Sequence, residues 1–158
     1  MLAQGGTPVN NQEMMNKIET VLEDAKTGVL ATVDAEGRPH ARWMTPVVLA
    51  QWPQALFAVT SPDFPKILQL NANNKVEWLI QTRALDQIIN VRGGINVLDN
   101  PSLKAQVMEA IGRKLTVFWK INKDKTDFVI LETVIDEASW YAPMKGLREI
   151  VKFGQGGV

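Results

Sequence analysis

A strand–turn–strand pattern between residues 29 and 46 constrains the fold of this 158-residue chain most strongly. Residues 29–33 are apolar and partly β-branched, which predicts a strand. Asp34 and Gly37 then supply turn chemistry, because glycine takes positive φ at no steric cost. A second strand is expected over residues 38–50. The pattern therefore predicts an antiparallel hairpin near the start of the chain.

Further strands are expected after this hairpin. Pro46 predicts a bend or an edge in the second strand, because proline donates no hydrogen bond to a ladder. Gly93 and Gly94 predict a bulge or a close backbone approach within a later, longer strand. The remaining runs with strand character are residues 55–60, 75–81, 86–98, 127–135 and 138–141.

Three helices are expected between the strands. The first follows Asn10, whose spacing to Glu13 is that of a capping box, and it ends at Gly28. A short second helix contains Lys66, and the third begins at Pro101. The expected caps are Ser61 or Asp63 for the second helix and Asp99 or Asn100 for the third.

These elements predict a mainly β fold in one domain. The strands outnumber the helices and several are joined by tight turns, which favours an antiparallel barrel over a parallel α/β sheet. We expect the domain to span residues 11–153, between a flexible segment at 1–10 and a tail at 154–158. A chain of this length buries a substantial core without disulfides or metals.

Composition excludes several classes of partner. Seventeen basic and seventeen acidic residues cancel, so no nucleic-acid or acidic-membrane partner is indicated. There is no cysteine, which excludes disulfides, thiolate nucleophiles and sulfur-ligated zinc sites and fits a cytoplasmic location. The first residues lack a basic and an apolar region, so no signal peptide is expected. No apolar run reaches the length of a membrane span.

Basic residues in the hairpin indicate an anion site. A strand beginning near residue 38 projects Arg38, His40 and Arg42 to one face, because side chains alternate with period two. Arg42 is the leading candidate, since a guanidinium holds phosphate oxygens in a two-pronged geometry. The alternative is an ordinary solvated arginine. About fifteen residues later, residues 59–66 run from a strand end into a helix start that contains Lys66, another natural position for an anion.

The order of these motifs resembles the FMN-binding split-barrel family typified by pyridoxamine 5′-phosphate oxidase, and in particular its bacterial general-stress branch. The resemblance covers about residues 13–142. The matching segments are Gly37-Arg38-Pro39-His40-Ala41-Arg42, Thr60-Ser61 followed by Lys66, residues 70–76, Val91-Arg92-Gly93-Gly94 and Leu98-Asp99-Asn100-Pro101. The resemblance implies a six-stranded split β-barrel with short flanking helices, and a homodimer with FMN between the subunits.

The family's cofactor contacts carry over by position, as implications of the resemblance. Arg42, Ser61 and Lys66 would bind the flavin phosphate. The remaining contacts would be Trp43, Met44, Thr45, Val59 and Thr60 along the ring and ribityl chain, and Gln87 and Trp140 at the subunit interface. For Trp43, Met44 and Trp140, packing without a cofactor is the alternative role.

Two departures from the family pattern matter. The family often has a serine and an arginine before the phosphate lysine, where this chain has Phe64 and Pro65, so fewer groups would hold the phosphate. The vitamin-forming oxidase also carries a substrate-binding histidine and arginine near its end. Here the only histidine is His40, which argues against oxidation of pyridoxamine phosphate. Without an evident carboxylate partner, His40 is expected to be structural or solvent-facing rather than catalytic.

The sequence leaves several functions open. The first is an FMN-dependent oxidoreductase with an unknown electron donor and substrate, and no catalytic residue is assigned. The others are a non-catalytic flavin store or sensor, a relative that binds deazaflavin or haem, and a structural dimer without flavin. No metal site is expected.

Overall fold

The computed structural model describes residues 9–112, 120 and 127–154. Within these ranges the chain forms three α-helices, one 3-10 helix and seven strands. Residues 1–8 of the segment expected at 1–10, and residues 155–158 of the tail expected at 154–158, lie outside the described residues. The helices are α1 (Asn11–Ala25), α2 (Pro65–Ala72), α3 (Pro101–Gly112) and η1 (Pro143–Lys145); the strands are β1 (Gly28–Val33), β2 (Pro39–Met44), β3 (Ala55–Thr60), β4 (Lys75–Gln81), β5 (Ile88–Leu98), β6 (Val129–Ala142) and β7 (Leu147–Lys152).

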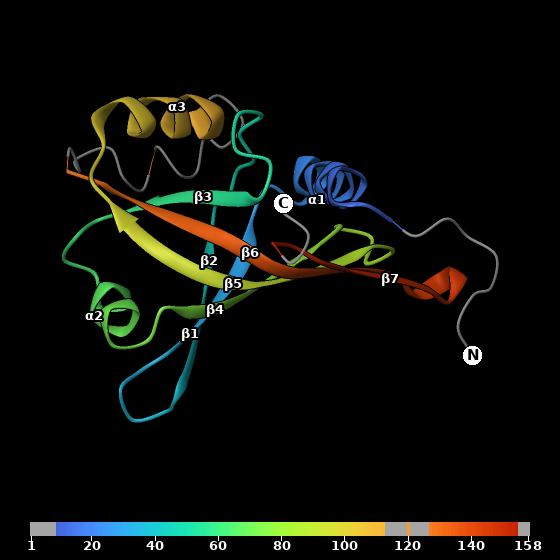
Figure 1. The fold of residues 1–158 in the computed structure, drawn as a ribbon, viewed down its shortest axis with the longest axis horizontal. Coiled ribbons are helices and arrows are strands. Elements are labelled where there is room, and N and C mark those ends of the chain that lie inside the picture. Colours follow the sequence, from blue (N-terminus) through green and yellow to red (C-terminus); the bar gives the residue numbers. More distant parts are fainter. Residues whose placement is uncertain (1–8, 113–119, 121–126, 155–158) are drawn as a thin grey trace.

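The strands form an antiparallel sheet that curls into a six-stranded barrel, as expected. Its order is β2-β1-β4-β5-β6-β3, and β7 pairs with β6 outside this path (Figure 1). The two ends of the sheet meet where Val47, just after β2, pairs with Phe57 of β3. None of the helices described in these ranges is long and apolar enough to cross a membrane.

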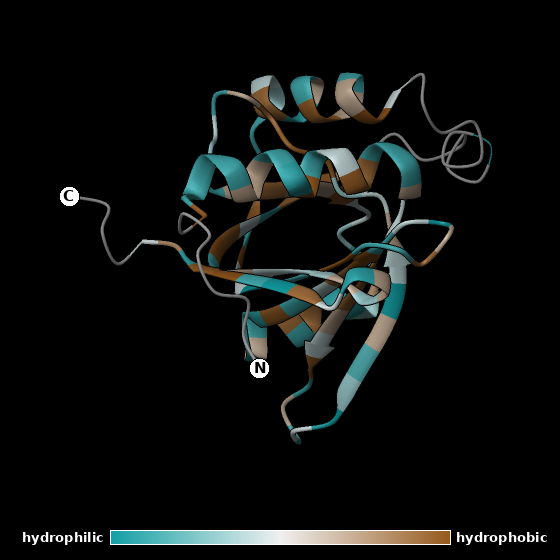
Figure 2. Cartoon of the chain, turned by 90° about the vertical axis from the view of Figure 1, so that its right-hand side faces the viewer, coloured by the Kyte–Doolittle hydropathy of each residue, from teal (hydrophilic) through white to brown (hydrophobic). Residues whose placement is uncertain are grey.

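Two apolar clusters hold the barrel together. The larger fills its interior and continues under α1, where Met14, Ile18 and Val21 meet barrel residues such as Trp78. The smaller lies between α3 and the outer face of β3. Both faces of β3 are therefore covered, and all six of its residues are buried rather than alternating in exposure. Figure 2 shows α1 and α3 lying together over one side of the strands.

The bulge expected at the glycine pair is present. The β5–β6 register shifts between Arg92 and Gly93. A Cβ on Gly93 would lie 2.1 Å from the carbonyl oxygen of Val134, so a side chain there would force the strands apart. The glycine is needed for close backbone approach rather than for positive φ.

Several strand boundaries differ from expectation. β2 ends at Met44 rather than Ala50, because Pro46 interrupts the ladder before the single pair at Val47. The expected strands at 127–135 and 138–141 are one continuous strand, β6, which pairs with β5 on one side and with β3 and β7 on the other. β7 was not expected; it returns along β6 after a turn in which Gly146 has φ 64°.

The helix caps were anticipated in two of three cases. Asn10 and Glu13 form the expected capping box, and the Asn100 side chain accepts the Leu103 N–H at 3.1 Å. The expected cap of α2 by Ser61 or Asp63 is wrong. Phe64 is the N-cap of α2, without a side-chain hydrogen bond, because Pro65 sets the first helical residue. α1 ends at Ala25 rather than at Gly28, and its C-cap, Lys26, has the left-handed conformation.

Candidate functional site

The place where the barrel closes is incomplete, and we call it the β2–β3 seam (residues 42–47 and 57–61). Val47 and Phe57 exchange two backbone hydrogen bonds of 2.8 and 2.9 Å. In an antiparallel register, residue 45 would next face Val59. Among the described backbone hydrogen bonds, none continues the ladder there. Because Val59 is two residues from Phe57, its N–H and C=O point to the same side, toward the seam.

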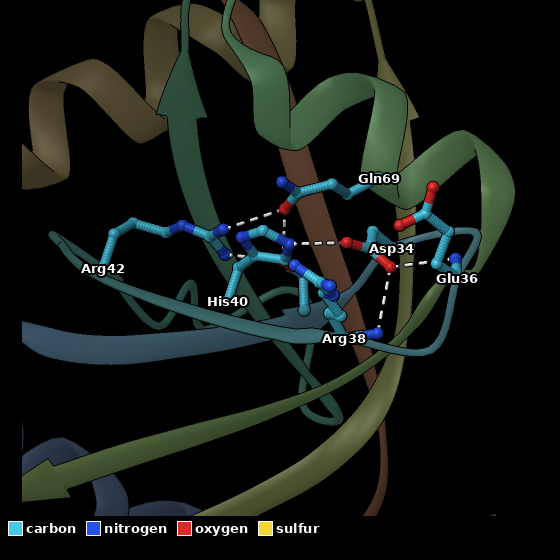
Figure 3. Close-up of polar contacts among 7 residues, drawn as sticks. Asp34, Glu36, Arg38, His40, Arg42 and Gln69 are labelled. Carbon is cyan, nitrogen blue, oxygen red and sulfur yellow. Dashed lines mark hydrogen bonds and ion pairs between the residues drawn. The ribbon is translucent and has the colours of Figure 1, made fainter.

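Arg42 lies beside this seam and is held by three internal acceptors. Its guanidinium donates to the Leu30 carbonyl at 3.2 Å, to Thr32 Oγ1 at 2.8 Å and to Gln69 Oε1 at 2.9 Å. Thr32 Oγ1 also donates to Gln69 Oε1 at 2.7 Å. Leu30 is the cross-strand partner of Arg42. β1 and α2 therefore fix the arginine from two sides (Figure 3).

The electrostatic setting of Arg42 distinguishes it from the surface arginines. It is half-buried, and burial lowers the pKa of its guanidinium. Within the described residues its three acceptors are all neutral. Exposed Arg92, by contrast, lies 2.7 Å from a Glu77 carboxylate oxygen and 3.6 Å from one of Glu137. A guanidinium has five N–H donors, and three are used here, so an anion would both compensate the charge and take the remaining donors.

α2 brings a second cation to the same region. The Lys66 ammonium donates to Thr60 Oγ1 at 2.9 Å and lies 4.2 Å from the centre of the Phe64 ring. Lys66 and Gln69 are three residues apart on α2 and therefore share one helical face. Since Gln69 accepts from Arg42, this helix face connects the two cations. Buried Ser61 lies between Thr60 and α2, and its hydroxyl accepts the Asp63 N–H at 3.4 Å.

The other residues expected along the flavin ring and ribityl chain differ in whether their side chains or only their backbone could contact a ligand in the seam. The Trp43 side chain is 81% exposed on the outer face, whereas Met44 packs against the main core. Thr45 lines a cavity of about 250 Å³ between α1, α3 and the segment after β2. The Val59 side chain is buried under α3, so Val59 offers only its backbone to a ligand in the seam.

Gln87 and Trp140 lie together but away from Arg42. The Trp140 Nε1 donates to Gln87 Oε1 at 2.9 Å, and the Lys17 ammonium lies 3.8 Å above the Trp140 ring. Gln87 precedes β5 at the end of the β4–β5 pair, whereas α2 lies next to the opposite end of β4. Within one chain, the described hydrogen bonds and ring contacts of this pair do not include Arg42 or the residues that hold it.

His40 has a carboxylate partner, contrary to expectation. Its Nε2 lies 2.8 Å from Asp34 Oδ2 (Figure 3). The other oxygen, Oδ1, accepts the N–H groups of Glu36 and Arg38, each at 2.9 Å. The hydrogen bond to His40, followed by that from Arg38, lowers the pKa of Asp34 from its usual 3.8. The turn folds Asp34 back over β2. The sequence did not indicate this pair, because the two residues are six positions apart.

Sequence reasoning missed two residues of this network, Gln69 and Thr32. Gln69 carries a weak signal, since it follows Lys66 by three residues on a helix. Thr32 is a polar residue in an apolar strand whose side chain is fully buried, and buried hydroxyls require partners. Neither signal identifies Arg42 as the partner, because that requires the β1–β2 register and the position of α2.

Comparison with known proteins agrees with the sequence resemblance. The family described as pyridoxamine 5′-phosphate oxidase matches residues 14–140. General stress protein 26 of Bacillus subtilis (strain 168) is 28% identical over 127 residues, covering 78% of this chain and 85% of that protein.

Solved structures share the fold at lower identity. General stress protein 26 from Bacillus anthracis str. Sterne has a TM-score of 0.67 and 22% identity, over 88% of this chain and 98% of that one. A related FMN-binding protein from Nostoc punctiforme gives 0.63 and 13%, over 85% and 87%. A haem-binding protein from Mycobacterium smegmatis gives 0.69 and 17%, over 94% of this chain and 60% of that one. The fold and the match over residues 14–140 together show that the chain belongs to the pyridoxamine 5′-phosphate oxidase family.

Proposed function

We propose that this protein binds FMN, with the phosphate at Arg42, Ser61 and Lys66 and the ring along the β2–β3 seam. The observation that carries the proposal is the half-buried Arg42 guanidinium, whose acceptors in the described residues are all neutral. A phosphate supplies the missing negative charge and matches the planar donor geometry. The Nostoc punctiforme neighbour, described as FMN-binding, supports the same ligand class.

The seam suits a flat, polar ring system. The Val59 N–H and C=O point toward it without a ladder partner among the described residues. Buried backbone groups need hydrogen-bond partners, and a flavin ring edge offers both donors and acceptors. Because the Val59 side chain is buried under α3, a ring in the seam would contact this residue through its backbone alone.

The bound flavin would supply electron or hydride transfer, which makes an FMN-dependent oxidoreductase of the general-stress type the activity that we propose. The chain's own residues hold the phosphate and orient the ring. A non-catalytic flavin store uses the same contacts, and turnover with a reduced nicotinamide distinguishes the two. His40 is the only histidine, which argues against pyridoxamine phosphate as the substrate.

A homodimer is part of this proposal. Trp43, Val29 and Leu79 are cross-strand neighbours on the outer face of β2, β1 and β4, and Trp43 and Leu79 are exposed. An exposed apolar row of this kind favours a protein contact. Gln87 and Trp140 have no described contact with Arg42 within one chain, and in a homodimer they would approach the flavin of the partner subunit. Sedimentation of the protein with and without FMN tests this arrangement.

The double variant Arg42→Ala/Lys66→Ala tests the phosphate assignment. It should lose FMN retention while unfolding cooperatively as the wild type does. The matched control is Lys75→Ala/Arg92→Ala, which removes the same charges from exposed positions on β4 and β5. Undiminished FMN binding by the folded first variant, or equal losses in both, would refute the assignment.

A further inference from the structure

Its position on β2 and its pairing with β1 both place His40 next to the residues that hold Arg42. It is two residues before Arg42 on β2, so both side chains share one face of the strand. It is also the direct cross-strand partner of Thr32, whose hydroxyl joins Arg42 to Gln69. Directly opposed side chains start about 5 Å apart. Both relationships place the imidazole at the edge of the proposed phosphate site.

Asp34 fixes the tautomer of the neutral imidazole. An ionised carboxylate only accepts hydrogen bonds, so the proton of neutral His40 resides on Nε2, which contacts Asp34. Nδ1 is then an acceptor that disfavours an anion. A second proton must enter at Nδ1 and converts it into a charged donor. Among the described residues, the hydrogen bonds of the ring run only to Asp34.

We propose that His40 is a proton-dependent third cation of the anion site, held by Asp34, which strengthens the binding of a phosphate monoester when its imidazole is protonated. This inference rests on the proposed FMN function. It assigns to His40 a specificity role for the phosphate, not a catalytic one.

The charged groups around His40 come from the hairpin and from α2. On the hairpin they are Asp34, which contacts the ring, and Arg38 and Arg42. α2 contributes one charged residue, Lys66, and β1 contributes none. A bound phosphate adds negative charge and therefore favours protonation of His40. By linkage, protonation favours the phosphate to the same extent.

The test measures FMN dissociation constants by flavin fluorescence from about pH 5.5 to 8.5, in the wild type and in His40→Asn, with His40→Gln as a second variant. Titration of the phosphate of free FMN is the same for the wild type and the variants. The ratio of the variant to the wild-type dissociation constant therefore reports the contribution of His40. Because the side chain is 40% exposed, we expect this ratio to rise about three- to tenfold toward low pH and to approach one above about pH 8.

Two controls separate a phosphate role from a structural one. Riboflavin has the same ring without the phosphate, so its affinity should not depend on His40 at any pH. Asp34→Asn keeps an acceptor for the turn N–H groups but removes the carboxylate that holds the imidazole, so the rise in affinity at low pH should be reduced.

Each alternative result overturns the inference. A ratio that does not change with pH removes the role of the proton. An equal pH dependence for riboflavin makes His40 a structural residue of the hairpin. If the wild type binds no FMN at any pH, the proposed function itself fails, and the inference fails with it.

Discussion

Replacing Arg42 should remove phosphate affinity with little loss of stability. Of the five N–H donors of the guanidinium, three bind acceptors within the chain, and two are left for an anion. Charge-assisted hydrogen bonds contribute about 1.5–3 kcal/mol each, and partial solvent exposure reduces this, so two give about 2–4 kcal/mol. Arg42→Ala should therefore weaken FMN binding by about 30- to 1,000-fold. Arg42→Lys retains the charge without the fork and should lose about tenfold.

The folded state should tolerate the same change. Loss of three hydrogen bonds is offset by removal of a half-buried charge whose described partners are neutral, so the unfolding free energy should change by less than about 1.5 kcal/mol. The assays are FMN and riboflavin titrations with urea unfolding of the flavin-free proteins, and Arg92→Ala is the control. An unchanged FMN-to-riboflavin affinity ratio in folded Arg42→Ala would show that Arg42 does not bind the phosphate.

Three further changes test the packing and the turn. Gly93→Ala should cost more than about 2 kcal/mol in thermal unfolding, because its Cβ would lie 2.1 Å from the Val134 carbonyl oxygen; a neutral result would mean that the bulge relaxes easily. Thr133→Val should cost about 1–3 kcal/mol by orphaning the buried Nε1 of Trp78, which donates to Thr133 Oγ1 at 2.9 Å, and a cost near zero in urea unfolding would contradict this. Because the pKa of Asp34 is lowered in the folded state, its carboxylate stabilises the fold above pH 3.8, and this contribution is lost as the pH falls through the folded-state pKa. Asp34→Asn should therefore lose less stability than the wild type below about pH 4. Identical losses of stability in acid for the two proteins would count against the Asp34 interactions.

Local patterns predicted the elements whose ends are marked by local signals. The bounds of β3 and β4 agree with expectation, because turn residues and helix starts delimit them. The capping box of α1 depends on two residues three positions apart, which is visible in the sequence. Pro65 likewise marks the start of α2, but the polar residues before it were the more conventional caps.

Long-range pairing could not be predicted in the same way. β6 spans 14 residues because β5 supports it on one side while β3 and then β7 support it on the other. The apparent break at Asp136 is not a turn, because this exposed residue is the one that the bulge leaves without a partner on β5. β7 is short and mostly exposed, so its sequence carries little strand signal, and it is held as a strand by pairing with β6.

The candidate site shows the same division. The anion-binding potential of Arg42 and Lys66 follows from residue type and spacing. In the structure Arg42 donates to Gln69, which follows Lys66 by three residues on α2. The three described acceptors of Arg42 are all neutral only because β1 and α2 meet at one point, which no local pattern contains. The Asp34–His40 contact was missed because it depends on how the turn folds back.

The most direct measurement is the absorbance spectrum of the purified protein, followed by titration with FMN and, separately, with FAD. We expect the two-peaked absorbance of a flavin, or its appearance on adding FMN, with tight FMN binding and weak FAD binding. An intense Soret band, or no affinity for either flavin, would contradict the assignment of the β2–β3 seam and Arg42 to FMN.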